Sequence, residues 1–212
     1  MVRKYIDLHR PEEARLNKLH DYYIGKHPIL SRTVQDSSKP CNKLVSGYPK
    51  LITDTMAAFF AGEAVTYSFP DDDMQMTFNG ILEYNDDAQE NSKLSMDCSI
   101  YGCAYELLYH DDNADIRFKA LDAKYCIPIY DNTLENGLLY LIRYYDETDI
   151  MTGNIKTYVE VYSKQAITRY ILEGYAISFE SETQHYFQDV PVCVYQNNGD
   201  TGRIRCRSSS SY

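Results

Sequence analysis

The residues best suited to acid–base chemistry are two clusters of carboxylates, Asp71–Asp73 and Asp111–Asp112. Paired carboxylates can act as general acid and general base when their surroundings separate the two pKa values. Both clusters lie in short polar stretches between strand-like segments, where aspartates commonly occupy solvated turns. We therefore interpret them as turn residues and predict no catalytic role for them.

The second cluster also has the spacing of a calcium-binding loop. Asp111, Asn113 and Asp115 occupy positions equivalent to 1, 3 and 5 of an EF-hand, and Asp122 falls at position 12. However, Ile116 replaces the glycine of the sharp turn, and Asp122 replaces the bidentate glutamate. The flanking residues alternate as in strands, so we predict a hairpin turn that binds calcium no better than millimolar.

The remaining reactive side chains are dispersed along the chain. There is no Gly-rich phosphate loop, no Gly-x-Ser-x-Gly elbow, no His-Glu-x-x-His motif and no Cys-x-x-Cys pair. We expect the cysteines to be small core residues or free thiols. We predict no catalytic, cofactor-binding or metal-binding residue and no enzyme activity. The residues concerned are His9, His20, His27, His110 and His185, and Cys41, Cys98, Cys103, Cys126, Cys193 and Cys206.

The basic residues do not form an evident nucleic-acid patch. The chain has 21 Lys and Arg against 31 Asp and Glu, a formal net charge of −10. Binding to phosphate backbones depends on Lys and Arg that displace counterions, so this excess of acid disfavours nonspecific nucleic-acid binding. We interpret the densest basic groups as solvated surface: Arg3, Lys4 and Arg10 near the start, and Arg203, Arg205 and Arg207 near the end.

Length and composition indicate one folded domain, with room for an appendage. The chain has 212 residues, of which 44% are hydrophobic and 25% charged, and domains commonly have about 100–200 residues. The longest apolar run, Met56–Ala61, has six residues, whereas a membrane-spanning helix needs about 20. The first residues include no apolar segment of a secretory signal, so the expected location is the cytoplasm.

Helical periodicity marks the first half of the chain. One helix is expected from Pro11, as the first helical residue, to Gly25. Another is expected within residues 41–62, either kinked at Pro49 or continuous from about Pro49. A third is expected over about residues 78–101, with a possible break at residues 85–87.

The helix within residues 41–62 has the most regular apolar pattern. Its apolar positions recur at three-to-four-residue spacing, which is typical of a helix that packs on a core. We therefore predict that this face is buried, and that an exposed face would instead indicate a subunit interface. The positions are Leu44, Val45, Tyr48, Leu51, Ile52, Thr55, Met56, Phe59 and Phe60.

After Gly102 the apolar period changes to two and tyrosine becomes abundant, which indicates strands. The connections have hairpin lengths and leave no room for crossover helices, so the sheet should be antiparallel. The predicted fold is α+β, with helices over about residues 10–101 packed beside a β-rich region over about residues 102–196. The predicted strands are Ala104–His110, Ile116–Leu121, Tyr125–Tyr130, Leu138–Asp146, Lys156–Ser163, Ala166–Leu172, Tyr175–Phe179 and Val192–Tyr195.

Several segments, taken in order, resemble the portal proteins of long-tailed bacteriophages of Gram-positive hosts. Each is weakly diagnostic alone, whereas the ordered set at suitable spacings over about residues 22–200 is specific. The segments are YYIGKHPILSR (22–32), CNKLVSGYPKLITDTMAAFFAGEAVTYS (41–68), SIYGCAYELLYHDDNADIRFKALDAKYCIPIYD (99–131), LLYLIRYYDE (138–147), TYVEVYSKQAITRY (157–170) and VPVCVYQNNGD (190–200).

The resemblance implies a structural function in phage assembly. Portal proteins of this type form a ring, generally a dodecamer, at one vertex of the procapsid, and they are not enzymes. The terminase motor, with its large subunit, pumps DNA through the ring. Scaffold or capsid protein and a head-to-tail adaptor are the other implied partners, and the implied locations are the bacterial host cytoplasm and the virion. The matched region corresponds to the outer wing of the portal.

The resemblance also defines the expected domain limits and the expected assembly state. Residues 1–200 would form the wing-like domain, and residues 201–212 a disordered or aberrant tail in a C-terminally truncated family member. Because the segments after the wing build the channel, we expect a monomer or weak small oligomer without affinity for duplex DNA. The alternative function is an acidic calcium-binding or hydrolytic β-domain unrelated to portals.

Overall fold

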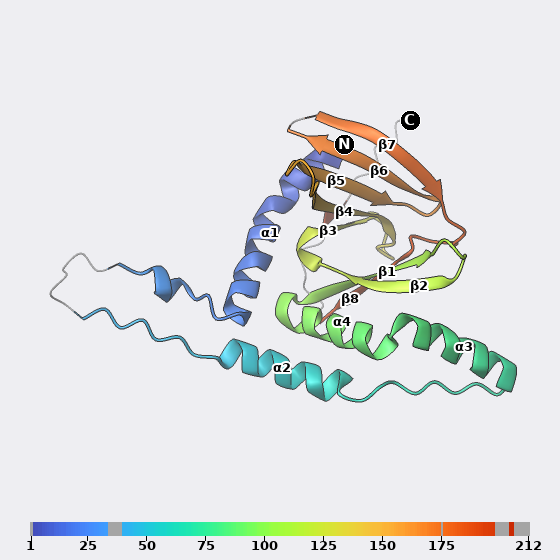
Figure 1. Cartoon of the computed structure of the whole chain (residues 1–212), viewed down its shortest axis with the longest axis horizontal. Helices are drawn as coiled ribbons and strands as arrows, with labels where there is room; N and C mark the ends of the chain where they lie inside the picture. The colour runs from blue at the N-terminus through green and yellow to red at the C-terminus, as the bar shows by residue number, and fades with distance from the viewer. Residues whose placement is uncertain (1, 34–39, 175, 198–203, 206–212) are drawn as a thin grey trace.

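The computed structural model describes residues 2–33, 40–174, 176–197 and 204–205. Two regions stand out in Figure 1: a stack of β-strands closed by helices, and a thin layer that extends beyond it on both sides. We call the strands between residues 103 and 196, with the helices α1 and α4, the β body. We call residues 24–33 and 40–85, which contain helices α2 and α3, the helical arm. The predicted α+β class is confirmed.

Helix α1, Val2–Tyr23, closes one side of the β body. The prediction that this helix begins at Pro11 is wrong, because Pro11 lies inside it. A proline inside a helix removes one backbone hydrogen bond and costs about 3 kcal/mol. Burial of Ile6 and His9, on the turns before the proline, offsets that cost. Tertiary packing therefore extends the helix through a residue that would otherwise begin it.

The other helices begin and end at residues with identifiable caps. Pro49 lies in the first turn of α2, which confirms that the continuous helix begins near this residue. The predicted break around residues 85–87 is also confirmed, because Asp86 has a left-handed backbone (φ 53°) between α3 and α4. Helix α3 begins at Asp72, earlier than the predicted start at about residue 78. The bounds are η1 Pro28–Ser31, α2 Tyr48–Ala61, α3 Asp72–Asn85 and α4 Asp87–Tyr101.

The change of apolar period after Gly102 marks a real boundary. Gly102 ends α4 in the left-handed region, with φ +82°, and its N–H donates to the carbonyl of Cys98. Within the described residues, three of the strands that follow form one antiparallel sheet in the order β2-β1-β8. Their bounds are β1 Cys103–His110, β2 Ile116–Leu121 and β8 Val192–Gln196.

The other described strands form a larger sheet in the order β7-β6-β5-β4-β3-β9. Its first five strands are antiparallel, as predicted, while β9 pairs in parallel with β3, a pairing that we did not predict. The short helix η2, Ala123–Tyr125, connects β2 to this sheet. The strand bounds are β3 Cys126–Tyr130, β4 Leu138–Thr148, β5 Ile155–Tyr162, β6 Ala166–Glu173, β7 Ala176–Gln184 and β9 Ile204–Arg205.

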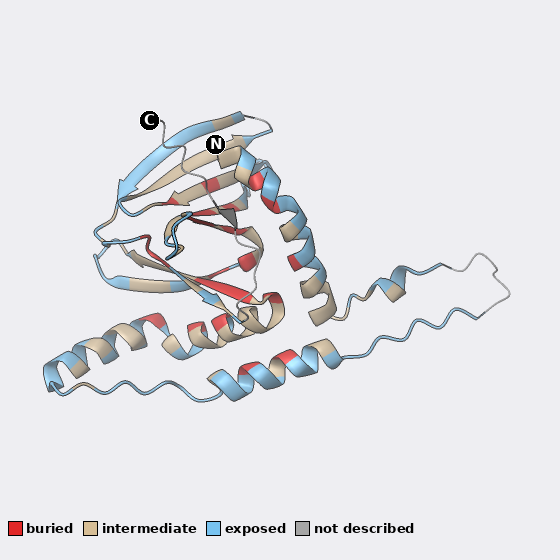
Figure 2. Ribbon diagram, turned by 180° about the vertical axis from the view of Figure 1, so that it is seen from behind, coloured by how far each residue is buried: buried red, intermediate tan, exposed pale blue. Residues whose placement is uncertain are grey.

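The core lies where the two sheets, α1 and α4 meet. Figure 2 shows most buried residues in this part of the molecule, and few in the arm. One cluster joins both sheets to both helices, and a second joins α1 to the larger sheet. The first contains Leu16, Tyr101, Tyr105, Leu121, Cys126, Leu141, Tyr162 and Val192, and the second Ile6, Ile127, Ile129, Ile142, Tyr144 and Val159.

Two polar side chains attach the helices to β2. Glu90 of α4 is 1% exposed, and its carboxylate accepts hydrogen bonds from Lys93, Lys119 and the backbone N–H of Ala120 at 2.7–2.9 Å. Asn85, at the end of α3, donates to the carbonyl of Ile116 at 3.0 Å and accepts from the N–H of Phe118 at 3.1 Å. These contacts fix the junction between the arm and the body.

None of the helices in the described parts of the chain is long and apolar enough to cross a membrane.

Candidate functional site

The sequence suggested that the cluster Asp71–Asp73 lies in a turn between strands. This prediction is wrong, because the cluster lies at the N-terminus of helix α3. The Asp71 carboxylate is the N-cap of α3 and accepts from the N–H groups of Asp73 at 2.9 Å and Met74 at 3.4 Å. Asp72 and Asp73 occupy the first turn, where negative charge stabilises the helix dipole. The cluster therefore has a complete structural explanation as a helix start.

The loop at Asp111 is the predicted hairpin turn. His110 and Ile116 pair directly across it, at the ends of β1 and β2. The Asp111 Oδ1 accepts from the N–H groups of Asn113 and Asp115, and Oδ2 accepts from the hydroxyl of Tyr84 at 2.9 Å. The hydrogen bond from Tyr84 contributes most to lowering the pKa of Asp111.

Asp122, the other residue of the calcium-like pattern, lies elsewhere. It is the N-cap of η2 and accepts from the N–H of Lys124 at 3.0 Å. The whole of β2 separates it from the turn at Asp111. Among the described residues, no group of three or more His, Cys, Asp or Glu side chains is arranged to hold a metal ion.

The histidines serve as packing or hydrogen-bonding groups, and two of them, His110 and His185, contact the same ring of Phe187. His9 Nδ1 lies 3.1 Å from the hydroxyl of Tyr144, which donates to Glu13. Burial lowers the pKa of His9, against the opposite influence of Glu12 and Glu13. On the helical side, His20 contacts Tyr101 and His27 contacts Tyr22. Near the end of the strands, His110 contacts Phe187 and His185 contacts the carbonyl of Ser163.

The cysteines within the described residues are free thiols, as predicted, while Cys206 lies outside the described residues. Cys103 and Cys126 line a cavity of about 310 Å³ between α1 and the strands, which is also lined by Arg15 and Glu12. Burial raises the pKa of both thiols. Since the thiolate is the reactive form of cysteine, burial disfavours reaction at these two side chains.

Two residues of the early basic group, Arg3 and Arg10, pair with an acid on their own helix. Arg3 Nε lies 3.2 Å from Asp7 and its Nη1 donates to the carbonyl of Gly174, while Arg10 Nε lies 3.6 Å from Asp7. Of the late basic group, Arg203 and Arg207 lie outside the described residues. Lys4 is exposed on α1.

The largest difference from the sequence-based expectation is in α2. The helix exists, but the prediction that its apolar face is buried is wrong. Phe59 is 90% exposed and Phe60 78% exposed. We define the α2 stripe as five side chains at positions i, i+3, i+4, i+8 and i+11, which share one helical face. The stripe consists of Tyr48, Leu51, Ile52, Met56 and Phe59, all exposed.

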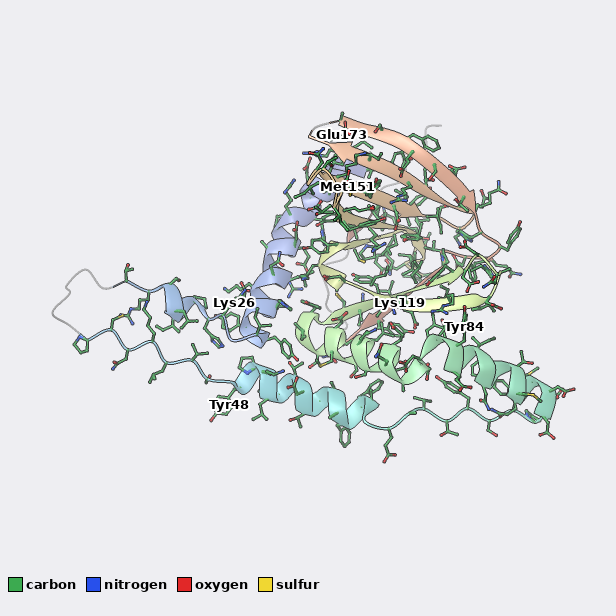
Figure 3. All side chains as sticks on the ribbon, in the orientation of Figure 1. Lys26, Tyr48, Tyr84, Lys119, Met151 and Glu173 are labelled. Carbon is green, nitrogen blue, oxygen red and sulfur yellow. The ribbon has the colours of Figure 1, made fainter. Side chains whose placement is uncertain are left out.

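The physical reason is that α2 packs on α4 through small residues. Thr53 and Ala57 are the buried residues of α2, and they lie on the face opposite the stripe. Tyr23, at the end of α1, holds the helix in this orientation: its hydroxyl donates to Asp54 at 2.9 Å and accepts from Lys50 at 3.1 Å. Figure 3 labels Tyr48 at the start of α2, on the side away from the β body.

A shallow groove of about 470 Å³ runs beside the stripe, between α2 and α4. Small side chains of α2, Ala58 and Ala61, form one wall together with Gly62, while Ser92 and Met96 of α4 form the other. Tyr23, Lys50 and Asp54 also line the groove, so the arm presents an apolar ridge next to a depression of mixed polarity. Such a surface can bind a protein but offers no reactive group.

The chain matches a known family over nearly its whole length. Residues 3–204 match the family described as phage portal protein, SPP1 Gp6-like. Among curated proteins, the chain is 22% identical over 221 aligned positions to the portal protein of Clostridium phage phiCD119, and 23% identical over 221 to the portal protein of Bacillus phage SPP1. Each alignment covers 93% of this chain.

The two alignments cover 49% and 43% of the relatives, so the chain spans about half the length of the curated proteins it matches. The family match includes both the arm and the β body, and hence the α2 stripe as well as the core. On this match over residues 3–204, the chain belongs to the SPP1 Gp6-like family of phage portal proteins.

Proposed function

We propose that this chain acts as a structural subunit of a phage portal vertex and works by assembly, without catalysis. The observation that carries the proposal is the family match over residues 3–204. The surface chemistry supports it, because the unusual feature of the described surface is an apolar helix face and not a cluster of reactive side chains.

The proposal extends to the partners of a portal. Copies of the chain would take part in a ring, generally a dodecamer, through which the terminase moves DNA, in contact with scaffold or capsid protein and a head-to-tail adaptor. Within such a ring we assign the chain to the outer wing, where helices pack beside an antiparallel sheet. It would act in the bacterial host cytoplasm during assembly and then remain in the virion.

The alternative, an acidic calcium-binding or hydrolytic β-domain, has no comparable support. The Asp111 carboxylate is already used by two backbone N–H groups and by Tyr84. Asp122, the fourth residue of the pattern, caps a different element. No geometry in the described residues favours either version of this alternative.

The test is to locate the protein in assembling phage heads. Cells that carry the gene are induced, and procapsids are labelled with gold-conjugated antibody against the chain. A portal subunit should label a single vertex of each particle. Labelling over the whole shell, or none on particles that contain terminase and capsid protein, would contradict the proposal. A terminase large-subunit gene upstream and a head-morphogenesis gene downstream would be independent support.

A further inference from the structure

We propose that the α2 stripe is a docking surface for a second copy of this chain, with Phe59 of one copy seated in the groove beside α2 of the other. The proposal rests on the assembly function proposed above and adds the surface through which the copies meet. Three observations carry it: the area and chemistry of the stripe, its charge, and the groove beside it.

The stripe is larger than the apolar patches that a monomer commonly exposes. An aromatic side chain buries about 150–250 Å²; at the exposures found here, the stripe and Phe60 together present roughly 900 Å². The largest patch on a typical monomer is about 300–600 Å². A standard interface takes about 800 Å² from each partner, so the stripe together with Phe60 reaches the size of one.

The side-chain polar groups on the face of the stripe are the hydroxyls of Tyr48, at the start of α2, and of Thr55. Thr55 lies within it, and its hydroxyl donates to the carbonyl of Leu51 at 2.7 Å, inside the same helix. Lys50 and Asp54, the charged residues of α2, line the groove beside the stripe, where they pair with each other at 3.0 Å. A partner that leaves the hydroxyl of Tyr48 at the solvent-exposed edge could therefore cover the apolar side chains without burying an unpaired charge.

The charge of this segment favours a like partner. Residues 42–69 contain two cations, Lys43 and Lys50, and two anions, Asp54 and Glu63, and so have a formal charge of zero on a chain of −10. Two copies would repel each other across most of their surfaces, but not here. The stripe is thus a place where two such acidic chains can meet at low electrostatic cost. The repulsion elsewhere keeps the association weak.

The groove supplies the complementary surface on the same molecule. The wall formed by Ala58, Ala61 and Gly62 leaves space beside α2, and Met96 provides an apolar floor. Phe59, 90% exposed on the adjoining face, is the side chain that can fill such a space on a second copy. A surface that offers both the projecting ring and the depression is complementary to the same surface on a second copy, which is what two-fold association of identical chains requires.

Sedimentation velocity over a range of chain concentrations tests the proposal. The unaltered chain should associate reversibly at micromolar concentration, and the association should not weaken as salt rises, because it buries apolar surface and screening reduces repulsion. Phe59→Ser should weaken it at least tenfold. The matched control is Met151→Ser: Met151 is 92% exposed and lies in the hairpin after β4, distant from α2 in Figure 3. It should leave association unchanged.

A mixing experiment tests the groove. Ala58→Glu blocks the depression and retains a good helix former, and circular dichroism verifies that both variants fold. Each variant alone should fail to associate at micromolar concentration. An equimolar mixture should recover part of the association, because Phe59 of the Ala58→Glu chain can enter the intact groove of the Phe59→Ser chain. Absence of any recovery would refute insertion of Phe59 into the groove.

A chain that stays monomeric at high micromolar concentration would overturn the docking proposal and assign the stripe to a different partner. Equal weakening by Phe59→Ser and Met151→Ser would overturn it too. These failures are distinct from failure of the portal function. Single-vertex labelling with a monomeric chain would contradict only the docking surface, whereas stripe-dependent association without vertex labelling would contradict only the portal assignment.

Discussion

The β body and the helical arm are both rich in apolar residues, yet only the body buries them. In β4 of the body, Leu141 is 0% exposed and Ile142 2% exposed, whereas Ile52 and Phe59 of the arm are 61% and 90% exposed. Within the described residues of the arm, the buried positions are Thr53, Ala57 and Asn85. An apolar pattern of equal quality thus has opposite outcomes in the two regions.

The difference lies in the surfaces available to each region. A central strand of the larger sheet, such as β4, has a facing sheet or helix to cover it, and strands pair along both of its edges. Helix α2 has one neighbour of comparable length, α4, and contacts it through the small residues Thr53 and Ala57. Apolar periodicity therefore predicts that a face needs cover, and does not specify whether the same chain supplies that cover.

The sharpest test of this contrast compares one leucine from each region. Leu141→Ala should reduce the free energy of unfolding by about 2–5 kcal/mol, because it leaves a cavity in the core between the sheets. Leu51→Ala, at a position 60% exposed on α2, should cost less than about 1 kcal/mol. Urea melts followed by tyrosine fluorescence measure both. Similar losses would mean that the arm is packed as firmly as the body.

A smaller effect, also in the body, should depend on pH. Burial raises the pKa of Asp97 to about 7, and Asp122 adds to the shift. Because the folded pKa is above the unfolded value, the ionised carboxylate destabilises the fold above neutral pH, and this cost disappears as pH falls towards 4. Asp97→Asn should therefore stabilise the chain by roughly 1–2 kcal/mol at pH 8, with little effect at pH 4. A pH-independent difference in thermal melts would contradict this.

Removal of the α3 cap tests whether the arm unfolds separately. Asp71→Ala deletes the acceptor for two backbone N–H groups and should cost about 1 kcal/mol. We expect the loss to be local, seen as faster amide hydrogen exchange in α3 and unchanged exchange in β4. Asp72→Asn, in the same turn, is the control because it keeps the cap. Faster exchange in β4 would show that arm and body unfold together.

Truncation of the most exposed ring should have a still smaller effect on stability. If Phe59 were buried, as the sequence pattern alone predicts, its replacement by alanine would reduce the free energy of unfolding by about 3–5 kcal/mol. At 90% exposure, we expect Phe59→Ala to change the free energy of unfolding by less than about 0.5 kcal/mol at concentrations where the chain is monomeric. A loss above 2 kcal/mol under these conditions would restore the core interpretation.

The smallest expected effect is that of calcium at the junction of the two regions. Asp111 of the β1–β2 turn accepts from Tyr84 of α3 and from two N–H groups of its own turn. Calcium should therefore bind no better than millimolar and leave the melting temperature unchanged at micromolar concentration. Micromolar affinity in calorimetry, abolished by Asp111→Asn, would contradict the turn assignment and revive the calcium-binding alternative.

Local features of the chain were predictable because they depend on near neighbours in sequence. The alternation after Gly102 predicted the strands from β1 to β6 and β8 to within one or two residues, since side chains in a strand alternate between two faces. A start of α2 near Pro49 was one of the two predicted alternatives, and the break between α3 and α4 was predicted around residues 85–87. Hairpin connections predicted antiparallel pairing of consecutive strands from β3 to β7.

Three features of the fold depended on contacts with residues distant in sequence. Helix α1 continues through Pro11 because the β body buries Ile6 and His9. Glu90 is buried because Lys119 and the N–H of Ala120, on β2, satisfy its carboxylate.

The orientation of α2 is the third such feature and the most consequential. The sequence alone determined that a helix with one apolar face lies within residues 41–62, because spacing along a helix is a local property. Only the tertiary structure decided that this face points to solvent. Tyr23 from α1 and the small residues that meet α4 set the rotation of the helix, and neither contact is encoded in the periodicity of α2 itself.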